Sequence, residues 1–220
     1  MGKTLAIVSA NTGNFEEPVK HEKQILKDFE ITEHVFTDEN YPPRYNAMTP
    51  RMQARLIKMS TWQLLPGYDY YLWIDSSCRL ARSDAVDWFI KQLDSADMAF
   101  LKHPHRKTVG EEADFLRERL AQEKAGKKKK YILPRYDGER LDEQMALVDP
   151  HNKLYATTAF IYANNPSSTD MLTIWWLHTS MFHMDEQLSV EHAIRHNNTH
   201  VNTINENYLK STYIQCVRKS

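Results

Sequence analysis

Asp75 stands directly after a short apolar run, at a position where a carboxylate could do chemistry. The run is YYLWI (residues 70–74), and the small polar residues Ser76 and Ser77 follow Asp75. In open α/β sheets, ligands bind beyond the carboxyl ends of the strands. Mg²⁺ and Mn²⁺ typically take one or two carboxylates together with phosphate oxygens of a substrate. Asp75 is therefore either a metal ligand or a turn residue that starts the next segment.

A stripe of positive charge precedes this strand. The segment RMQARLIKMSTWQLLP has helical apolar spacing, and Pro66 with Gly67 ends it. Arg51, Arg55 and Lys58 are spaced four and three residues apart, so they share one stripe of the predicted helix. Arginine forms bidentate bonds to phosphate. The stripe either binds phosphate groups or is a solvated helix face.

A second group of basic residues lies in LKHPHR, where Lys102, His103 and Arg106 crowd the end of a predicted strand. Three potential cations in one place need a counter-charge. Glu111 and Glu112 follow and could supply it, and so could a bound anion. The alternative is a structural turn with solvated charges.

Strand-like and helix-like segments alternate along the chain. The predicted strands are TLAIVSA, ITEHVFTD, YYLWI, DMAFLKH, KLYATTAFIYANN and HVNTIN, and a helix is also expected from about Val19 to Phe29. This alternation predicts an α/β fold, with a mostly parallel central sheet and helices on both faces. No linker divides the chain, so we expect one domain over residues 1–220. Residues 111–150 form a polar, partly helical insertion, which includes the charge run Lys127 to Lys130.

Composition limits the classes of partner. The chain has 28 Lys and Arg against 29 Asp and Glu, a net charge of -1, which argues against a protein built mainly to coat nucleic acid or anionic membrane. Cys78 and Cys216 are too few for a disulfide framework. The apolar run LAIVSA is too short for a signal-peptide core or a membrane span. We therefore expect a cytoplasmic protein without a membrane partner.

The order of several motifs resembles a known family. A strand followed by WID and small polar residues, after a helix with Arg and Lys, resembles the core of GT-A type glycosyltransferases. LPGYDYYLWIDSS, FLKHPHR, EEA, EQM, LYATTAFIYANN and EQLS occur in the order of a glycosyltransferase-like domain family of plants and bacteria, formerly catalogued as a domain of unknown function. The resemblance covers roughly Leu5 to Asn198 and implies a GT-A-like, Rossmann-like fold.

The resemblance implies a metal and nucleotide-sugar site. Asp75 corresponds to the first carboxylate of an Asp-x-Asp motif, but Ser77 stands where the second would be. A hydroxyl is a weaker ligand than a carboxylate, which puts the Mn²⁺ or Mg²⁺ dependence in question. GT-A enzymes often add a C-terminal histidine ligand, for which His200 is the candidate; the alternative is a surface or packing histidine.

The other implied roles follow the same motifs. Ala10, Asn11 and Thr12 would receive the nucleotide, and Arg55, Lys58, Lys102, His103 and Arg106 would face the donor. Thr157 and Thr158, inside an apolar run, would line the sugar and acceptor pocket.

Glu186 and Gln187 match an Asp-Gln pair of the family, with Asp185 as an alternative shifted by one residue. Such groups can bond sugar hydroxyls and stabilise a developing oxocarbenium charge. The alternative is simple capping of the helix that follows.

The expected function is transfer of a hexose or pentose from a nucleotide-diphosphate sugar to a hydroxyl acceptor. That acceptor is a glycan or a hydroxymethylated DNA base, which the lysine run would suit. Two alternatives stay open: a catalytically silent nucleotide- or sugar-binding module, suggested by Ser77, and a nucleotidyltransferase, which uses a related sheet and metal.

Overall fold

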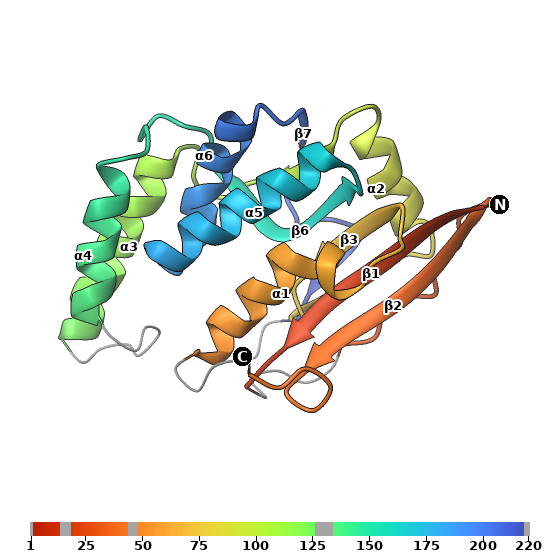
Figure 1. Cartoon of the computed structure of the whole chain (residues 1–220), viewed down its shortest axis with the longest axis horizontal. Coiled ribbons are helices and arrows are strands. Elements are labelled where there is room, and N and C mark those ends of the chain that lie inside the picture. The colour runs from red at the N-terminus through yellow and green to blue at the C-terminus, as the bar shows by residue number, and fades with distance from the viewer. Residues whose placement is uncertain (1, 14–18, 44–47, 126–133, 218–220) are drawn as a thin grey trace.

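A central β-sheet carries the fold of the protein in a computed structural model, which describes residues 2–13, 19–43, 48–125 and 134–217 (Figure 1). Within these residues the sheet has six strands in the order β2-β1-β3-β6-β5-β7. The strands are β1 (Lys3–Asn11), β2 (Phe29–Thr37), β3 (Tyr70–Ile74), β5 (Met98–Lys102), β6 (Tyr155–Ala163) and β7 (Val201–Ile204). A separate two-stranded sheet pairs β4 (Cys78–Leu80) with β8 (Ile214–Cys216).

Strand direction gathers the predicted functional segments at one edge of the sheet. β1 runs parallel to β2 and β3, and β5 runs parallel to β7, whereas β6 is antiparallel to both β3 and β5. The carboxyl ends of β1, β3, β5 and β7 therefore lie at the same edge as the amino end of β6. The predicted α/β class with a mostly parallel sheet is confirmed.

Helices cover both faces of the sheet. They are α1 (Pro50–Leu64), α2 (Ala85–Leu93), α3 (Val109–Lys124), α4 (Pro134–Met145), α5 (Pro166–Met181) and α6 (Gln187–Asn197). One core cluster joins the sheet to α1, α5 and α6, and a second joins its other face to α2 and the β4–β8 pair. Alternate residues of β1 enter the two clusters, Ala6 and Val8 the first and Leu5 and Ile7 the second. Burial on both faces explains why this strand reads as a continuous apolar run.

The start of α1 is fixed by capping chemistry. Thr49 occupies the N-cap, where its side-chain oxygen accepts a hydrogen bond from the backbone N–H of Met52 at 3.2 Å. Pro50 follows at the first helical position, where its lack of an N–H costs nothing. The helix begins here, so its basic first turns lie beside the carboxyl ends of β1 and β3.

Helices α3 and α4 form a hairpin with a small core of its own, to which Leu188 of α6 contributes. Figure 1 shows this hairpin projecting at the end of the molecule away from β2. The lysine run at residues 127–130 lies outside the described residues.

The helix expected from Val19 to Phe29 is wrong. Residues 19–28 contain no helix, and β2 begins at Phe29. The backbone N–H groups of Glu22 and Ile25 donate to the carbonyls of Leu80 and Ser83 at 2.9 Å. These tertiary hydrogen bonds hold the segment against the chain around β4 and take the place of helical ones.

Cys78 and Cys216 form a disulfide that joins β4 to β8. This pairing was not predicted from the sequence. Val217 donates its backbone N–H to the carbonyl of Ser77 at 2.7 Å, so the C-terminal strand is tied directly behind the Asp75 turn. No helix in the described part of the chain has the length and apolar character needed to cross a membrane.

Candidate functional site

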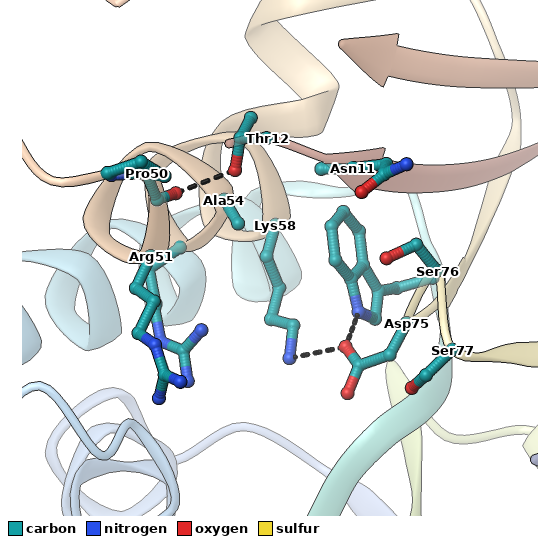
Figure 2. A pocket seen from close by; sticks show the side chains of 12 residues that line it. Asn11, Thr12, Pro50, Arg51, Ala54, Lys58, Asp75, Ser76 and Ser77 are labelled. Atoms are coloured by element: carbon teal, nitrogen blue, oxygen red, sulfur yellow. Dashed lines mark hydrogen bonds and ion pairs between the residues drawn. The ribbon is translucent and has the colours of Figure 1, made fainter. Parts of the chain in front are cut away.

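A cavity of about 380 Å³ opens at the carboxyl ends of β1 and β3, beside the first turns of α1 (Figure 2). Three segments distant in sequence line it: Ala10, Asn11 and Thr12; Pro50, Arg51, Ala54, Arg55 and Lys58; Trp73, Asp75, Ser76 and Ser77. Thr12 donates its hydroxyl hydrogen to the carbonyl of Pro50 at 2.6 Å and so fixes the end of β1 to the start of α1. The sequence-predicted residues of β1, α1 and β3 thus meet in one cavity.

Lys58 lies between two carboxylates. Its Nζ is 3.0 Å from Oδ1 of Asp75 and 2.9 Å from Oε1 of Glu186, and it donates to the carbonyl of Thr157 at 3.0 Å. Only 3% of the lysine side chain is exposed. Two carboxylates so close to one ammonium offset the cost of burying its charge. Figure 2 shows this side chain reaching from α1 toward Asp75.

Glu186 is buried, and both of its carboxylate oxygens have partners. Its Oε1 also accepts the hydroxyl hydrogen of Thr157 at 2.9 Å, and its Oε2 lies 2.7 Å from a guanidinium nitrogen of Arg55. Burial would raise the pKa of Glu186, but Arg55 and Lys58 outweigh it and hold that pKa well below its usual range. The side chain is therefore a fixed anion that holds two cations in place.

Arg55 is the second cation that Glu186 holds. Besides this ion pair, its Nε donates to the carbonyl of Met184 at 3.2 Å. Burial lowers the pKa of Arg55, and the charges of Glu186, Asp185 and Asp75 more than reverse that, leaving it raised. Three acidic groups therefore stabilise this guanidinium at the cavity wall.

Asp75 makes the turn that the sequence offered as one alternative, and its side chain also faces the cavity. Its carbonyl accepts from the N–H of Cys78 at 2.8 Å, which makes the turn. Its carboxylate lines the cavity, with Oδ1 accepting from Nε1 of Trp73 at 2.8 Å and with 38% of the side chain exposed. The indole contact was missed by sequence reasoning. The signal was the spacing, because residues two apart in a strand point to the same face.

Asp185 and Gln187 sit at the start of α6. The side chain of Asp185 accepts from the backbone N–H of Gln187 at 3.3 Å, which is the capping alternative, while Glu186 turns toward Lys58. Thr157 is buried and bonds Glu186, and the carbonyl of Thr158 accepts from the N–H of Asp75 at 2.8 Å. These residues support the cavity wall and do not line the cavity.

The LKHPHR group is not a set of three free cations. Arg106 forms an ion pair with Glu112 and stacks on the ring of Phe115, with its guanidinium carbon 4.0 Å from the ring centroid. Nδ1 of His103 accepts from the backbone N–H of Arg106 at 2.9 Å. Burial, followed by the charge of Arg106, lowers the pKa of His103 to about 4, so the ring is neutral near pH 7. Lys102 and His103 line a separate cavity, of about 190 Å³, beyond β5 and β7.

His200 does not join the other expected metal ligands. It stands just before β7, at the amino end of that strand, and its backbone N–H donates to Asp97 at 3.1 Å. Asp75 follows the carboxyl end of β3, at the opposite edge of the sheet, so the two side chains cannot share a cation.

The remaining donor set is poor for a resident metal. Asp75 and Ser77 offer one carboxylate and one hydroxyl, and Oδ1 of Asp75 already accepts from Lys58 and Trp73. Among the residues that the structure describes, no cluster of three His, Cys, Asp or Glu side chains could hold a metal ion. The donors present do not fit a metal held by the protein alone.

Comparisons with known proteins found no matching family model and no matching curated protein. Solved structures include a similar one, a glycosyltransferase involved in the glycosylation of the major capsid of PBCV-1. The alignment has a TM-score of 0.47 and 8% sequence identity, and it covers 91% of this chain and 81% of that one. We therefore base the functional proposal on the site itself.

Proposed function

We propose that the protein is a glycosyltransferase that moves a sugar from a nucleoside-diphosphate sugar to a hydroxyl acceptor. The observation that carries the proposal is the buried ammonium of Lys58 facing Asp75 in a cavity that Arg51 and Arg55 also line. A sheet-edge cavity with cationic side chains on one helix suits a diphosphate. The ordered motifs that resemble the glycosyltransferase-like family support the same activity.

The cationic side chains of α1 would offset the charge that develops on the leaving group. Preorganised charges of this kind stabilise a transition state because they need no reorganisation during the reaction. Glu186 would act on the reaction through Lys58 and Arg55, as a positioning residue, since only 4% of it is exposed. Asn11 and Thr12 would meet the ribose and base, because they line the part of the cavity beyond β1.

In the transfer step, the acceptor oxygen forms a bond to the anomeric carbon as the bond from that carbon to the diphosphate oxygen breaks. The electron pair of the broken bond leaves with the nucleoside diphosphate. The proton of the acceptor hydroxyl passes to the released diphosphate. No step requires an oxidant, a reductant or another co-reactant.

Calorimetric titration of nucleoside diphosphates tests the donor site. We expect one nucleotide to bind the wild type, and Lys58→Met to bind it at least ten-fold more weakly, as expected for the loss of a contact with a charged group. Lys91→Met, a change of an exposed lysine on α2, is the matched control. Titrations with Mn²⁺ and with a chelator measure whether binding depends on a metal ion. Absence of binding for every nucleotide would rule out the proposal.

Product analysis separates the alternatives. A glycosyltransferase releases a nucleoside diphosphate, a nucleotidyltransferase releases pyrophosphate from a nucleoside triphosphate, and a silent binding module releases neither. The silent module is favoured by one observation, that Asp75 is the sole carboxylate among the described residues that line the cavity. Turnover of any sugar nucleotide in the presence of acceptor eliminates it.

A further inference from the structure

The cavity of about 190 Å³ beyond β5 and β7 lies at the same edge of the sheet as the donor cavity. It is formed by the segments that follow Lys102, the last residue of β5, and Ile204, the last residue of β7. β6 is the strand between β3 and β5, and it is antiparallel to both. Neighbouring strands lie about 4.8 Å apart, so the ends of β3 and β5 are about 10 Å apart. Two cavities at this spacing along one edge can hold two parts of one extended molecule.

The walls of this cavity carry polar groups of both charge signs. An ammonium, a carboxylate, an imidazole and two amides line it together with one proline: Lys102, Glu206, His103, Asn205, Asn207 and Pro104. Hydroxyl groups of a ligand can donate to the carboxylate and the amide oxygens and accept from the nitrogens. A polyanion would be repelled by Glu206, and an apolar ligand would leave the polar groups without partners. The walls therefore suit a neutral molecule rich in hydroxyl groups, such as a sugar.

His103 is held as a neutral hydrogen-bond donor. Its Nδ1 accepts from the backbone N–H of Arg106 at 2.9 Å, so the neutral ring carries its hydrogen on Nε2. Only 7% of the residue is exposed, and the ion pair of Arg106 with Glu112 holds the segment that positions the ring. Nε2–H is therefore the donor that this ring can offer to a hydroxyl oxygen.

The opposite wall is also fixed in place. Oδ1 of Asn207 accepts from the backbone N–H of Leu209 at 3.0 Å, and the carbonyl of Asn207 accepts from the N–H of Lys210 at 2.8 Å. These bonds make a turn directly after Glu206. The chain then continues to β8, which the disulfide ties to β4 behind the Asp75 turn. One segment thus connects this cavity with the turn that lines the donor cavity.

The start of α6 lies near both cavities. The charge of Asp185 acts on the pKa of Arg55, which lines the donor cavity, and on that of His103, which lines this one, and raises each against the effect of burial. A carboxylate that acts on both residues marks the path between the two cavities as short.

We propose that the cavity beyond β5 and β7 binds one sugar unit of an oligosaccharide acceptor, an inference that rests on the proposed transferase function. The unit that reacts lies at the mouth of the donor cavity, and the unit bound here is farther along the same chain. It does not itself have to reach the anomeric carbon of the donor. A hydroxymethylated DNA base fits less well, because the backbone phosphates next to it would meet Glu206.

The dependence of affinity on acceptor length tests this proposal. The probes are xylose, glucose, galactose and mannose, each with its linear di- and trisaccharide, titrated by calorimetry in the presence of a nucleoside diphosphate. We expect at least one trisaccharide to bind ten-fold or more tightly than its monosaccharide. Equal affinity within every series, or no binding at all, would overturn the proposal, because no unit beyond the reacting one would then have a site.

Histidine ring signals locate the bound unit. In protein labelled with ¹⁵N at the histidine rings, we expect the trisaccharide to shift the signals of His103 and to leave those of His200, at the opposite edge of the sheet, in place. The signals of His103 are identified by their loss in His103→Asn, which keeps an acceptor for the N–H of Arg106. A trisaccharide that binds without shifting His103 lies elsewhere, which also overturns the proposal.

Two variants with matched controls test the polar contacts. Lys102→Met and Glu206→Gln are expected to weaken trisaccharide binding about ten-fold and to leave nucleotide affinity within about two-fold of wild type. Lys91→Met and Glu30→Gln, which make the same changes on α2 and β2, are expected to alter neither affinity. Unchanged trisaccharide affinity in both test variants would show that the ligand does not contact this cavity.

The same samples separate this proposal from the proposed function. If a nucleotide binds but no trisaccharide shifts His103, the acceptor assignment is overturned and the donor site stands. If a trisaccharide shifts His103 but no nucleotide binds, the transferase proposal fails and the acceptor assignment fails with it. An oligonucleotide containing 5-hydroxymethylcytosine that displaces the trisaccharide would overturn the choice of a glycan.

Discussion

The ammonium of Lys58 lies 3.0 Å from Asp75 and 2.9 Å from Glu186, so one buried cation joins two carboxylates that are 111 residues apart (186 minus 75). Asp75 faces the cavity, whereas Glu186 is sealed beneath it. An anion that enters the cavity would be attracted by the ammonium of Lys58. The two carboxylates already hold this ammonium in a fixed position. Lys58 therefore supports the fold, and in the proposed function it also binds the donor; the first prediction separates these two roles.

Replacing Lys58 by methionine is expected to lower the free energy of unfolding by about 3–5 kcal/mol, because Glu186 then loses one of its cations while buried. Denaturant unfolding measures this change. The double variant Lys58→Met/Glu186→Gln removes the uncompensated charge and is expected to recover much of the stability. It is not expected to recover nucleotide binding. Recovery of both would show that Lys58 has no role beyond the fold.

The pH dependence of stability follows from the lowered pKa of Glu186. Its folded-state pKa lies well below the unfolded value of 4.5, because Arg55 and Lys58 outweigh the opposing effect of burial. The unfolded state therefore binds the proton first as pH falls. The ion pairs contribute their stability above about pH 4.5, and this contribution declines as pH falls from there toward the folded pKa.

Unfolding titrations between pH 6 and pH 2.5 check this sign. Glu186→Gln is expected to flatten the loss of stability in that window, whereas Glu30→Gln, on the edge strand β2, is expected to leave the slope unchanged. An identical slope in wild type and Glu186→Gln would contradict the ionised, paired state of Glu186.

The strand ends could be predicted from sequence because buried strands read as apolar runs that stop at a polar residue. That rule identified Asp75 as a candidate, the family resemblance supplied Asn11, and the structure places both at the same edge of the sheet. The contact of Lys58 with Glu186 could not be predicted, because 128 residues separate them and no spacing rule connects α1 with α6. Motif resemblance named Glu186, but only the fold shows that it faces Lys58 and not the cavity.

The predictions that were wrong or missed also depend on tertiary structure that local sequence does not reveal. Residues 19–28 carry a plausible helical pattern, yet tertiary hydrogen bonds to Leu80 and Ser83 override it. The strands β4 and β8 have three residues each, too few for a detectable pattern, so their disulfide was missed. His200 was proposed as a ligand from its place in the sequence, and the direction of β7 carries it to the far edge.

Loss of the disulfide between Cys78 and Cys216 is expected to destabilise the protein by about 2–5 kcal/mol, since it closes a long loop in the unfolded chain. The bond also holds β8 behind the Asp75 turn, so nucleotide affinity should fall in Cys78→Ser/Cys216→Ser. Thermal unfolding and titration of the variant, and of wild type with and without a dithiol reductant, measure both effects. Equal affinity in all three samples would mean that the turn holds its shape without β8.

The role that the sequence motif implies for Arg106 differs from the contacts that Arg106 makes in the structure. The sequence favours it as a donor contact, but its guanidinium pairs with Glu112 and stacks on Phe115 outside the donor cavity. Arg106→Met should therefore leave nucleotide affinity within about two-fold of wild type, because no diphosphate contact is lost. It should lower the free energy of unfolding by about 3 kcal/mol, because Glu112, which is 2% exposed, loses its ion pair with Arg106.

The control for this variant is Arg106→Met/Glu112→Gln, which removes the buried charge as well and is expected to be more stable than the single variant. Calorimetry and denaturant unfolding on the same preparations give both readouts. A loss of nucleotide affinity of ten-fold or more in both variants would show that Arg106 does contact the donor. That outcome would require the segment around Pro104 to move when the nucleotide binds, since Arg106 does not line the donor cavity in the present arrangement.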